Sequence, residues 1–351
     1  MKRVSAVKII GSIGLVISML LNGCTTNSIT DNNVSGNDLT ATEVIRLMGN
    51  GINLGNTLEA YNHKSYVELG VDPTSFETLW GQPVTTRDMI DDMKAMGFDT
   101  LRIPVAWTNG INYESGDYTI DERLMNRVDE VVNYALDADM YVILNEHWDG
   151  SWWGMFGSAD EAVREKGMAL YKSMWTQISE HFSDYSYKLI FESANEELCH
   201  RLNDSDVTGT EGVLSEDECY ETTNRINSEF VKLVRSTGGK NADRFLLIAG
   251  YNTDFRKTCD DRYQMPEDTA KDKLLLSVHY YTPWDYCSDG NAKRWGTPGD
   301  YEEQNSLFQM LTKFTDLGYG VVIGEYAVMG AADKPDRDKF YANLLDNCDL
   351  Y

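Results

Sequence analysis

Short apolar runs alternate with longer amphipathic segments along most of the chain. Seven of these runs predict β-strands, at residues 51–55, 100–105, 141–144, 188–191, 245–249, 274–278 and 321–323. Several are apolar without alternation, which is typical of parallel strands that are buried on both faces. The pattern therefore indicates a parallel sheet whose strands are joined by helices.

Hydrophobic residues between the runs recur at helical spacing. The clearest set steps by three or four residues at a time and consists of Met168, Tyr171, Trp175, Ile178 and Phe182. Other sets of this kind predict helices around residues 89–96, 124–135 and 307–317. Alternating β and α units allow either an open, doubly wound sheet or a closed (β/α)8 barrel.

Two observations favour the barrel. No glycine-rich phosphate-binding turn follows the first predicted strand, which argues against a dinucleotide-binding sheet. Polar and aromatic residues crowd the carboxyl end of nearly every strand, where a barrel places its active site. The predicted fold is therefore α/β, a (β/α)8 TIM barrel.

The barrel is one strand short in this prediction. Only seven candidate strands are found, and the last helical stretch, at 336–346, runs on to the terminus at Tyr351. Closure of such a barrel needs an eighth strand. Either one strand escapes the pattern, or the eighth strand is missing at the C-terminus because the chain stops short of its own barrel.

The charge of the chain excludes several classes of function. Lys and Arg total 31 and Asp and Glu total 56 of the 351 residues, so the net charge is −25. Such a surface repels phosphate backbones and anionic lipids, which argues against nucleic-acid binding and against docking on membranes through basic patches. With 42% hydrophobic and 11% aromatic residues, the chain is too apolar to be disordered. We expect a globular monomer.

The first residues have the layout of an export signal. Three basic residues precede an apolar run of 13 residues at 9–21, which is too short to span a bilayer comfortably. The sequence Leu-Asn-Gly-Cys that ends at Cys24 resembles the lipobox of bacterial lipoproteins, in which cleavage before the cysteine precedes its acylation. Residues 1–23 are therefore predicted to be a lipoprotein signal peptide, with lipid attached to Cys24.

The domain organisation follows from this signal. Residues 24–40 are rich in Ser, Thr, Asn and Asp and predict a flexible tether, and residues 41–351 predict one catalytic domain. The protein is expected to be an outer-membrane or cell-surface lipoprotein that meets the membrane only through its lipid anchor. If Cys24 belongs to an ordinary secretory signal, the protein is secreted instead.

The remaining cysteines predict no metal centre. None of the five forms a CxxC pair or has a histidine at zinc-site spacing. Outside the cytoplasm Cys199 could pair with Cys219, or Cys259 with Cys287, and the odd number leaves at least one thiol free.

Carboxylates at the ends of two strands carry the candidate chemistry. Glu192, Glu196 and Glu197 lie within six residues, so at least one pKa should rise, which suits a general acid. The period of two puts Glu192 and Glu196 on one side of the fourth strand, if that strand continues so far. Glu325 directly follows a buried strand and a glycine, where a solvated charge is hard to explain. Hydrolysis of a glycosidic bond needs two such carboxylates, one protonated and one ionised.

Other side chains at the strand ends could tune these carboxylates. Arg102 lies inside an apolar strand, so it is either a structural ion-pair partner or the group that keeps a catalytic carboxylate ionised. His147 precedes Trp148 and two more tryptophans, whose faces can stack on sugar rings, although at least one of the three should belong to the loop core. His279 and Tyr281 share one face after the sixth strand.

Six segments, in the order of the chain, resemble glycoside hydrolase family 5 and in particular its bacterial endo-β-1,4-glucanases (cellulases). They are residues 51–59, 97–105, 145–149, 190–196, 279–283 and 323–326. The resemblance implies a retaining enzyme that binds β-glucan polysaccharide without a cofactor or metal, with Glu196 as the acid/base and Glu325 as the nucleophile. The resemblance implies that the following residues bind substrate or brace the nucleophile: Asn56, Arg102, His147, Trp148, Asn195, His279, Tyr281 and Trp284.

The resemblance implies a separate role for several of these residues. Asn195 would bond the sugar 2-hydroxyl, and Arg102 and Tyr281 would brace the nucleophile. His147 and His279 would line the −1 subsite, while the remaining residues would lie in the glucan cleft.

Three departures from the family pattern stand out. Trp148 stands where the family often has a second histidine, which should alter subsite preference. Glu197 follows the acid/base where proline is usual, a change expected to cost little. The eighth strand of the family carries a tryptophan under the −1 subsite, and no tryptophan follows Trp295 here. We therefore expect a truncated gene product or a fragment of a longer enzyme, with activity that is low or depends on further sequence.

Two alternatives stay open at this point. Within the family, the substrate could be xyloglucan, lichenan or mannan, because the preference depends on loops. Outside the enzymes, a non-catalytic, glycan-binding surface lipoprotein would have the same aromatic residues but would not need both Glu196 and Glu325.

Overall fold

The computed structural model describes residues 36–288, 292–330 and 334–351. The predicted signal peptide, Cys24 and the tether as far as residue 35 lie outside the described residues. From Gly36 onward the chain is packed into the fold, because the Lys273 ammonium donates hydrogen bonds to the carbonyl oxygens of Gly36 (2.9 Å) and Leu39 (2.6 Å). Gly36 and Leu39, which lie within the predicted tether, are therefore in contact with the domain.

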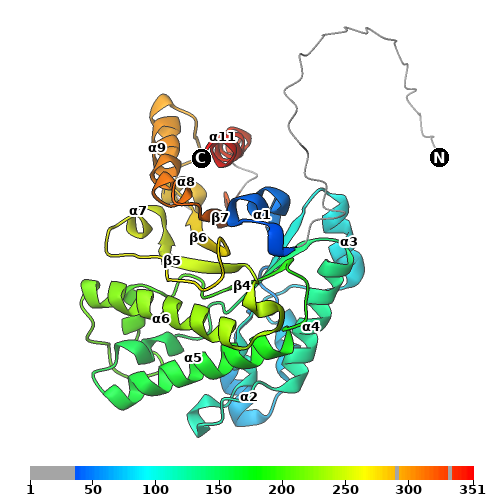
Figure 1. Cartoon of the computed structure of the whole chain (residues 1–351), viewed down its shortest axis with the longest axis vertical. Helices are drawn as coiled ribbons and strands as arrows, with labels where there is room; N and C mark the ends of the chain where they lie inside the picture. The colour runs from blue at the N-terminus through cyan, green and yellow to red at the C-terminus, as the bar shows by residue number, and fades with distance from the viewer. Residues whose placement is uncertain (1–35, 289–291, 331–333) are drawn as a thin grey trace, which may run out of the picture. The chain divides into compact units, whose positions relative to one another are not determined.

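Seven parallel strands pair in the order of the sequence (Figure 1). They are β1 (Gly51–Asn53), β2 (Thr100–Ile103), β3 (Tyr141–Asn145), β4 (Leu189–Glu192), β5 (Leu246–Asp254), β6 (Leu274–Tyr280) and β7 (Gly320–Tyr326). Each strand overlaps one of the predicted apolar runs, so the seven predicted strands are confirmed. The strands from β2 to β6 are buried along most of their length, as unbroken apolar runs require.

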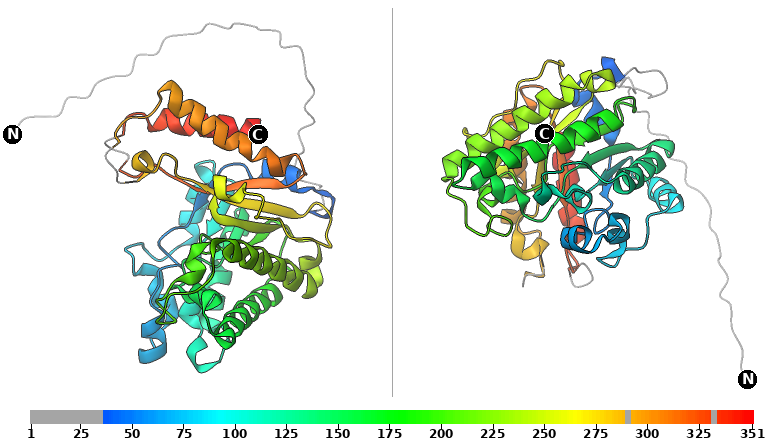
Figure 2. Two further views of the ribbon diagram at one scale, coloured as in Figure 1. Left: turned by 90° about the vertical axis from the view of Figure 1, so that its left-hand side faces the viewer. Right: turned by 90° about the horizontal axis from the view of Figure 1, so that it is seen from below.

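Helices cover the outside of this sheet. The described helices are α1 (Ala41–Met48), α2 (His63–Leu69), α3 (Arg87–Ala95), α4 (Glu122–Asp137), α5 (Glu161–His181), α6 (Glu216–Ser236), α7 (Phe255–Thr258), α8 (Trp284–Cys287), α9 (Pro298–Met310), α10 (Thr312–Thr315) and α11 (Arg337–Leu350). In Figure 1, α5 and α6 lie side by side on one flank, and in Figure 2, α9 and α11 lie together beside β6 and β7.

The helix predictions hold with one change. The apolar stripe of α5 is buried at Tyr171, Trp175 and Ile178, and the carboxylate of Asp160 caps its first turn by accepting the Ala162 N–H (2.9 Å). The single helix predicted at 307–317 is instead two, because α9 ends at Met310 and α10 begins at Thr312.

The barrel has one open seam, between β1 and β7. Among the described residues the strands pair only from β1 through β7, so the seven-stranded prediction and the missing eighth strand are both confirmed. The Asn53 amide of β1 crosses the seam and donates a hydrogen bond to the Gly324 carbonyl of β7 (2.9 Å). At the other end of β7, α1 packs so closely that a Cβ on Gly320 would lie 2.6 Å from the Ala41 carbonyl oxygen. The fold is a nearly closed (β/α)8 barrel that lacks one strand.

Two further findings concern the whole described part. The five described cysteines are all free thiols, so neither of the two disulfides considered from the sequence is formed. None of the helices in residues 36–288, 292–330 and 334–351 is both long and apolar enough to cross a membrane.

Candidate active site

The register of the sheet places polar side chains side by side at the carboxyl ends of the strands. Asn53 of β1 is paired with Arg102 of β2, and His279 of β6 is paired with Glu325 of β7. Glu196 lies in the loop after β4 and reaches the same place. One oxygen of Glu196, one oxygen of Glu325 and one ring nitrogen of His279 all lie within 4.8 Å of one another.

Arg102 is the buried cation at the centre of this site. Its Nε donates to Glu192 (2.7 Å), its Nη1 donates to Glu325 (2.9 Å), and its Nη2 donates to the Asn195 side-chain oxygen (2.8 Å). Glu192 is completely buried, whereas Glu325 remains partly accessible. Arg102 therefore pairs both with a fully buried carboxylate, Glu192, and with the candidate nucleophile, Glu325.

The surroundings of Glu325 keep it ionised. Burial alone would raise the pKa of Glu325, but the positive charges of His279 and Arg102 outweigh burial and hold this pKa well below its usual range. The Tyr281 hydroxyl adds a hydrogen bond to the second carboxylate oxygen (2.9 Å). An ionised carboxylate with an accessible oxygen can act as a nucleophile.

Two histidines with opposite shifts flank the pair. Burial would lower the pKa of His279, but the negative charge of Glu325 and the hydrogen-bond contact with Glu196 (Nδ1 to Oε1, 2.9 Å) raise it overall. Burial and the nearby charge of Arg102 lower the pKa of His147 to about 3, so that ring is neutral at ordinary pH. His279 can therefore donate a hydrogen bond from Nδ1 to Glu196, while His147 offers a neutral polar edge to a ligand.

Comparison with known proteins identifies the family of this chain. The family model described as Cellulase (glycosyl hydrolase family 5) matches residues 64–349. The chain belongs to glycosyl hydrolase family 5. This membership confirms the resemblance drawn from the six sequence segments.

Curated relatives of family 5 support the same enzyme class. Endoglucanase A of Paenibacillus barcinonensis is 35% identical over 328 residues, which cover 86% of this chain and 75% of that protein. The xyloglucan-specific endo-beta-1,4-glucanase BoGH5A of Bacteroides ovatus is 33% identical over 332 residues, which cover 91% of this chain and 62% of that protein. For Endoglucanase A of Clostridium longisporum, at 37% identity, the matched part is only 55% of its length.

Solved structures support the same enzyme class. A broad-specificity endoglucanase of family 5, subfamily 4, from Ruminococcus champanellensis, with bound cellotriose, superposes with a TM-score of 0.77 at 33% identity. The match covers 90% of this chain and 87% of that one. A family 5 lichenase from Caldicellulosiruptor sp. F32 in complex with cellotetraose has a TM-score of 0.76 at 30% identity and covers 88% of this chain and 84% of that one. The family 5 chain is therefore a glycoside hydrolase of the endo-1,4-β-glucanase class.

The remaining site predictions divide into two groups. Asn195 is buried against Arg102, but Asn56 and Trp148 are exposed in the loops after β1 and β3, and Trp284 is exposed at the start of α8. Trp148 has 45% and Trp284 66% of its surface exposed, which suits side chains that stack on a polymer. The other two tryptophans of the β3 loop, Trp152 and Trp153, are fully buried and belong to the loop core.

Sequence reasoning missed how Glu192 is used. Strand β4 ends at Glu192, so the alternation that would put Glu192 and Glu196 on one side does not continue. Glu192 lies under the site, where it accepts hydrogen bonds from the Ser277 hydroxyl (2.7 Å) and the Asn145 amide (3.0 Å) as well as from Arg102. No local sequence pattern reveals this anchor, because the pairing of Asn145 with Glu192 belongs to the register between two strands.

Proposed function

We propose that this family 5 chain hydrolyses internal β-1,4 bonds of a β-glucan with retention of configuration. The observation that carries the proposal is the spacing of oxygens of Glu196 and Glu325 within 4.8 Å. Retaining glycosidases keep their two carboxyl groups about 5–5.5 Å apart, whereas inverting enzymes leave room for a water molecule at about 6.5–9.5 Å. This spacing favours direct attack by a carboxylate.

The two carboxylates have different roles in the proposed reaction. Glu325, held ionised by Arg102 and Tyr281, attacks the anomeric carbon while Glu196 gives its proton to the departing glycosidic oxygen. The bond between carbon and the leaving oxygen breaks as the glycosyl ester of Glu325 forms. Glu196 then removes a proton from water, which attacks the same carbon and releases Glu325. His279 stands at hydrogen-bond distance from Glu196 and can donate to the carboxylate that Glu196 becomes after it has given up its proton.

The substrate is proposed from the relatives. The similar proteins include endoglucanases, a xyloglucan-specific endo-beta-1,4-glucanase and a lichenase. We expect the purified protein to release reducing ends from carboxymethylcellulose, xyloglucan or lichenan, and to lower the viscosity of the polymer faster than it releases reducing ends. Activity on mannan alone, or on none of these polysaccharides, would contradict the proposal.

The pH profile should follow the shifted pKa of Glu325. Because this pKa is lowered from 4.5, Glu325 stays ionised as the pH falls through 4.5, and kcat/KM should decline only at more acidic pH. The alkaline limb should report loss of the proton that Glu196 donates, which gives a bell-shaped profile. In Tyr281→Phe, one donor to the charged form is lost, so the acid limb should move upward by about one pH unit. A flat profile from pH 4 to 9, or an unmoved acid limb in the variant, would contradict the assignment.

The proposed reaction uses no metal. Glu196, His279 and Glu325 are close enough to ligate an ion, but the Arg102 guanidinium already neutralises Glu325. Dialysis against EDTA should therefore leave kcat/KM unchanged, and added Mg²⁺ or Ca²⁺ should not raise it. A loss of activity that a metal restores would show that the three groups act as ligands.

We further propose export with lipid attached to Cys24. The support is the lipobox-like sequence at the end of the apolar run. Cells that express the full chain should incorporate labelled palmitate into it, and Cys24→Ala should abolish the label. Equal labelling of both proteins would exclude acylation at this residue.

A further inference from the structure

Glu197, the residue directly after Glu196, is a buried carboxylate with both oxygens in use. Only 3% of its surface is exposed. One oxygen accepts the Trp148 backbone N–H (2.9 Å), and the other accepts the Asn195 backbone N–H (2.9 Å). One side chain thus joins the loop after β3 to the loop after β4.

Each of these two N–H groups is next to a site residue. The Trp148 N–H follows His147, and the Asn195 N–H belongs to the residue before Glu196. Regular strand structure ends at Asn145 in β3 and at Glu192 in β4. The last backbone bonds to neighbouring strands are donated by the N–H groups of His147 (2.9 Å) and Ser193 (3.0 Å), so Trp148 and Asn195 lie just beyond them. Trp148 also has a positive φ of 44°, a conformation that needs support from its surroundings.

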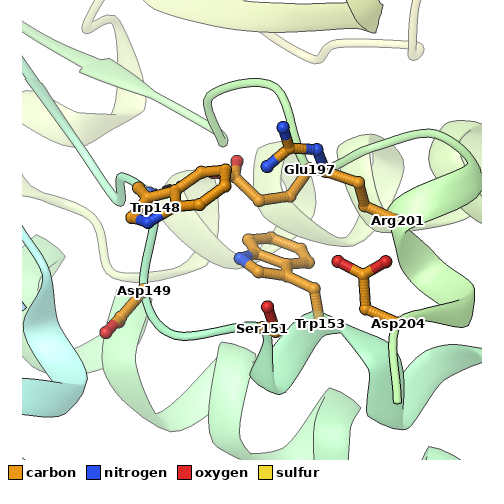
Figure 3. A pocket seen from close by; sticks show the side chains of 7 residues that line it. All are labelled: Trp148, Asp149, Ser151, Trp153, Glu197, Arg201 and Asp204. Atoms are coloured by element: carbon orange, nitrogen blue, oxygen red, sulfur yellow. Dashed lines mark hydrogen bonds between the residues drawn. The ribbon is translucent and has the colours of Figure 1, made fainter. Parts of the chain in front are cut away.

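The Trp148 side chain is also held, in addition to its backbone N–H. The Arg201 guanidinium lies 4.3 Å from the centre of the Trp148 ring. Figure 3 shows Trp148, Glu197 and Arg201 close together at the wall of a small pocket that Trp153 also lines. The tryptophan, the carboxylate and the arginine therefore form one packed unit beside the proposed acid/base.

A buried carboxylate at this position costs free energy, so we expect the Glu197 side chain to have a role. Burial, together with the negative charge of Glu196, raises the pKa of Glu197 to about 7. Two more buried carboxylates, Glu146 and Asp149, lie in the same loop region, and burial raises the pKa of each of them as well. A proline at this position could accept neither N–H bond, so the departure at Glu197 is not the nearly neutral change expected from the sequence.

We infer that Glu197 is a positioning residue, which sets the placement of Glu196 by tying the His147–Trp148 loop to the Asn195–Glu196 loop. The inference rests on the proposed function, in which Glu196 protonates the leaving oxygen. A displacement of about 1 Å between an acid and its target can lower a rate about 100-fold, so loosening this tie should selectively impair proton donation.

The test compares two cellobiosides that differ only in their need for a proton. Phenyl β-cellobioside has a basic leaving group and requires the acid, whereas 2,4-dinitrophenyl β-cellobioside does not. In Glu197→Gln the amide nitrogen must face one of the two N–H groups, so at least one bond is lost at constant size. We expect kcat/KM to fall about 10- to 100-fold for the phenyl substrate and less than about 3-fold for the dinitrophenyl substrate.

Glu77→Gln is the matched control. Glu77 is equally buried (3% exposed) and also accepts a backbone N–H, that of Thr85 (2.7 Å). It lies between α2 and α3 and pairs with Arg127 of α4. This variant should lose stability while keeping the wild-type ratio of kcat/KM for the two substrates. Glu197→Asp, which keeps the charge but shortens the reach, should show the selective loss even if the glutamine variant fails to fold.

The outcomes separate this inference from the proposed function. A wild-type protein that cleaves neither cellobioside and releases no reducing ends from the glucans overturns both. If the wild type is active and the Glu197 variants keep its substrate ratio, the positioning role is overturned while the proposed function stands. A selective loss on the phenyl substrate supports both.

Discussion

Glu325→Gln is expected to lower kcat/KM on the preferred β-glucan by at least ~10³-fold, because the amide cannot form the glycosyl ester. Glutamine keeps the size of the side chain and can still accept a hydrogen bond from Tyr281 or Arg102, so the fold should survive. Release of reducing ends, measured at equal concentrations of folded protein, checks the expectation.

The matched control is Glu302→Gln, on the exposed face of α9. It removes the same charge from a solvated position and should keep wild-type activity. Equal rates for the Glu325 variant and the wild type would remove Glu325 from the mechanism. Binding of glucan without any hydrolysis by the wild type would favour the non-catalytic, glycan-binding lipoprotein instead.

Arg102→Met should have the largest effect on stability. Removing the guanidinium leaves Glu192 fully buried without its cation, and breaking a buried pair in this way costs about 3–5 kcal/mol. Activity should fall as well, because Glu325 loses a cation that lowers its pKa. Urea unfolding followed by fluorescence measures the first effect, and kcat/KM near neutral pH measures the second.

Two further variants isolate the cause of the Arg102 effect. Arg102→Met combined with Glu192→Met removes both buried charges, so it should recover part of the lost stability but none of the activity. Arg87→Met breaks an exposed pair with Asp137 (2.8 Å) and should change stability little. If Arg102→Met unfolds at the same urea concentration as the wild type, the buried network is not what holds the strand ends together.

Strands β2 to β6 were predictable because burial on both faces leaves a continuous apolar run. The missing strand was predictable for the same reason, since no eighth run is present. The break between α9 and α10 was not, because the apolar spacing of residues 307–317 continues across it. The contact of Gly36 with Lys273 joins residues more than 200 positions apart, which no local pattern reveals.

The site was predictable where a charge interrupts an apolar strand end, as at Arg102 and Glu325. The partners of those charges were not, because they follow from the register between strands. Glu192 could be recognised as unusual, but only the sheet shows it lying beneath Arg102. The two hydrogen bonds of Glu197 were not predictable for a related reason. The Asn195 N–H reaches it through a turn of its own loop, and the Trp148 N–H comes from the loop after β3.

The most direct test of the central claim is to trap the covalent intermediate. In 2,4-dinitrophenyl 2-deoxy-2-fluoro-β-cellobioside, the fluorine slows both the formation and the hydrolysis of the glycosyl-enzyme, while the good leaving group restores the rate of its formation. The glycosyl-enzyme should therefore accumulate. Mass spectrometry of the digested protein should then find one fluorocellobiosyl group on the peptide that contains Glu325. A label on the peptide that contains Glu196, or steady hydrolysis of glucan with no labelled peptide, would contradict the account.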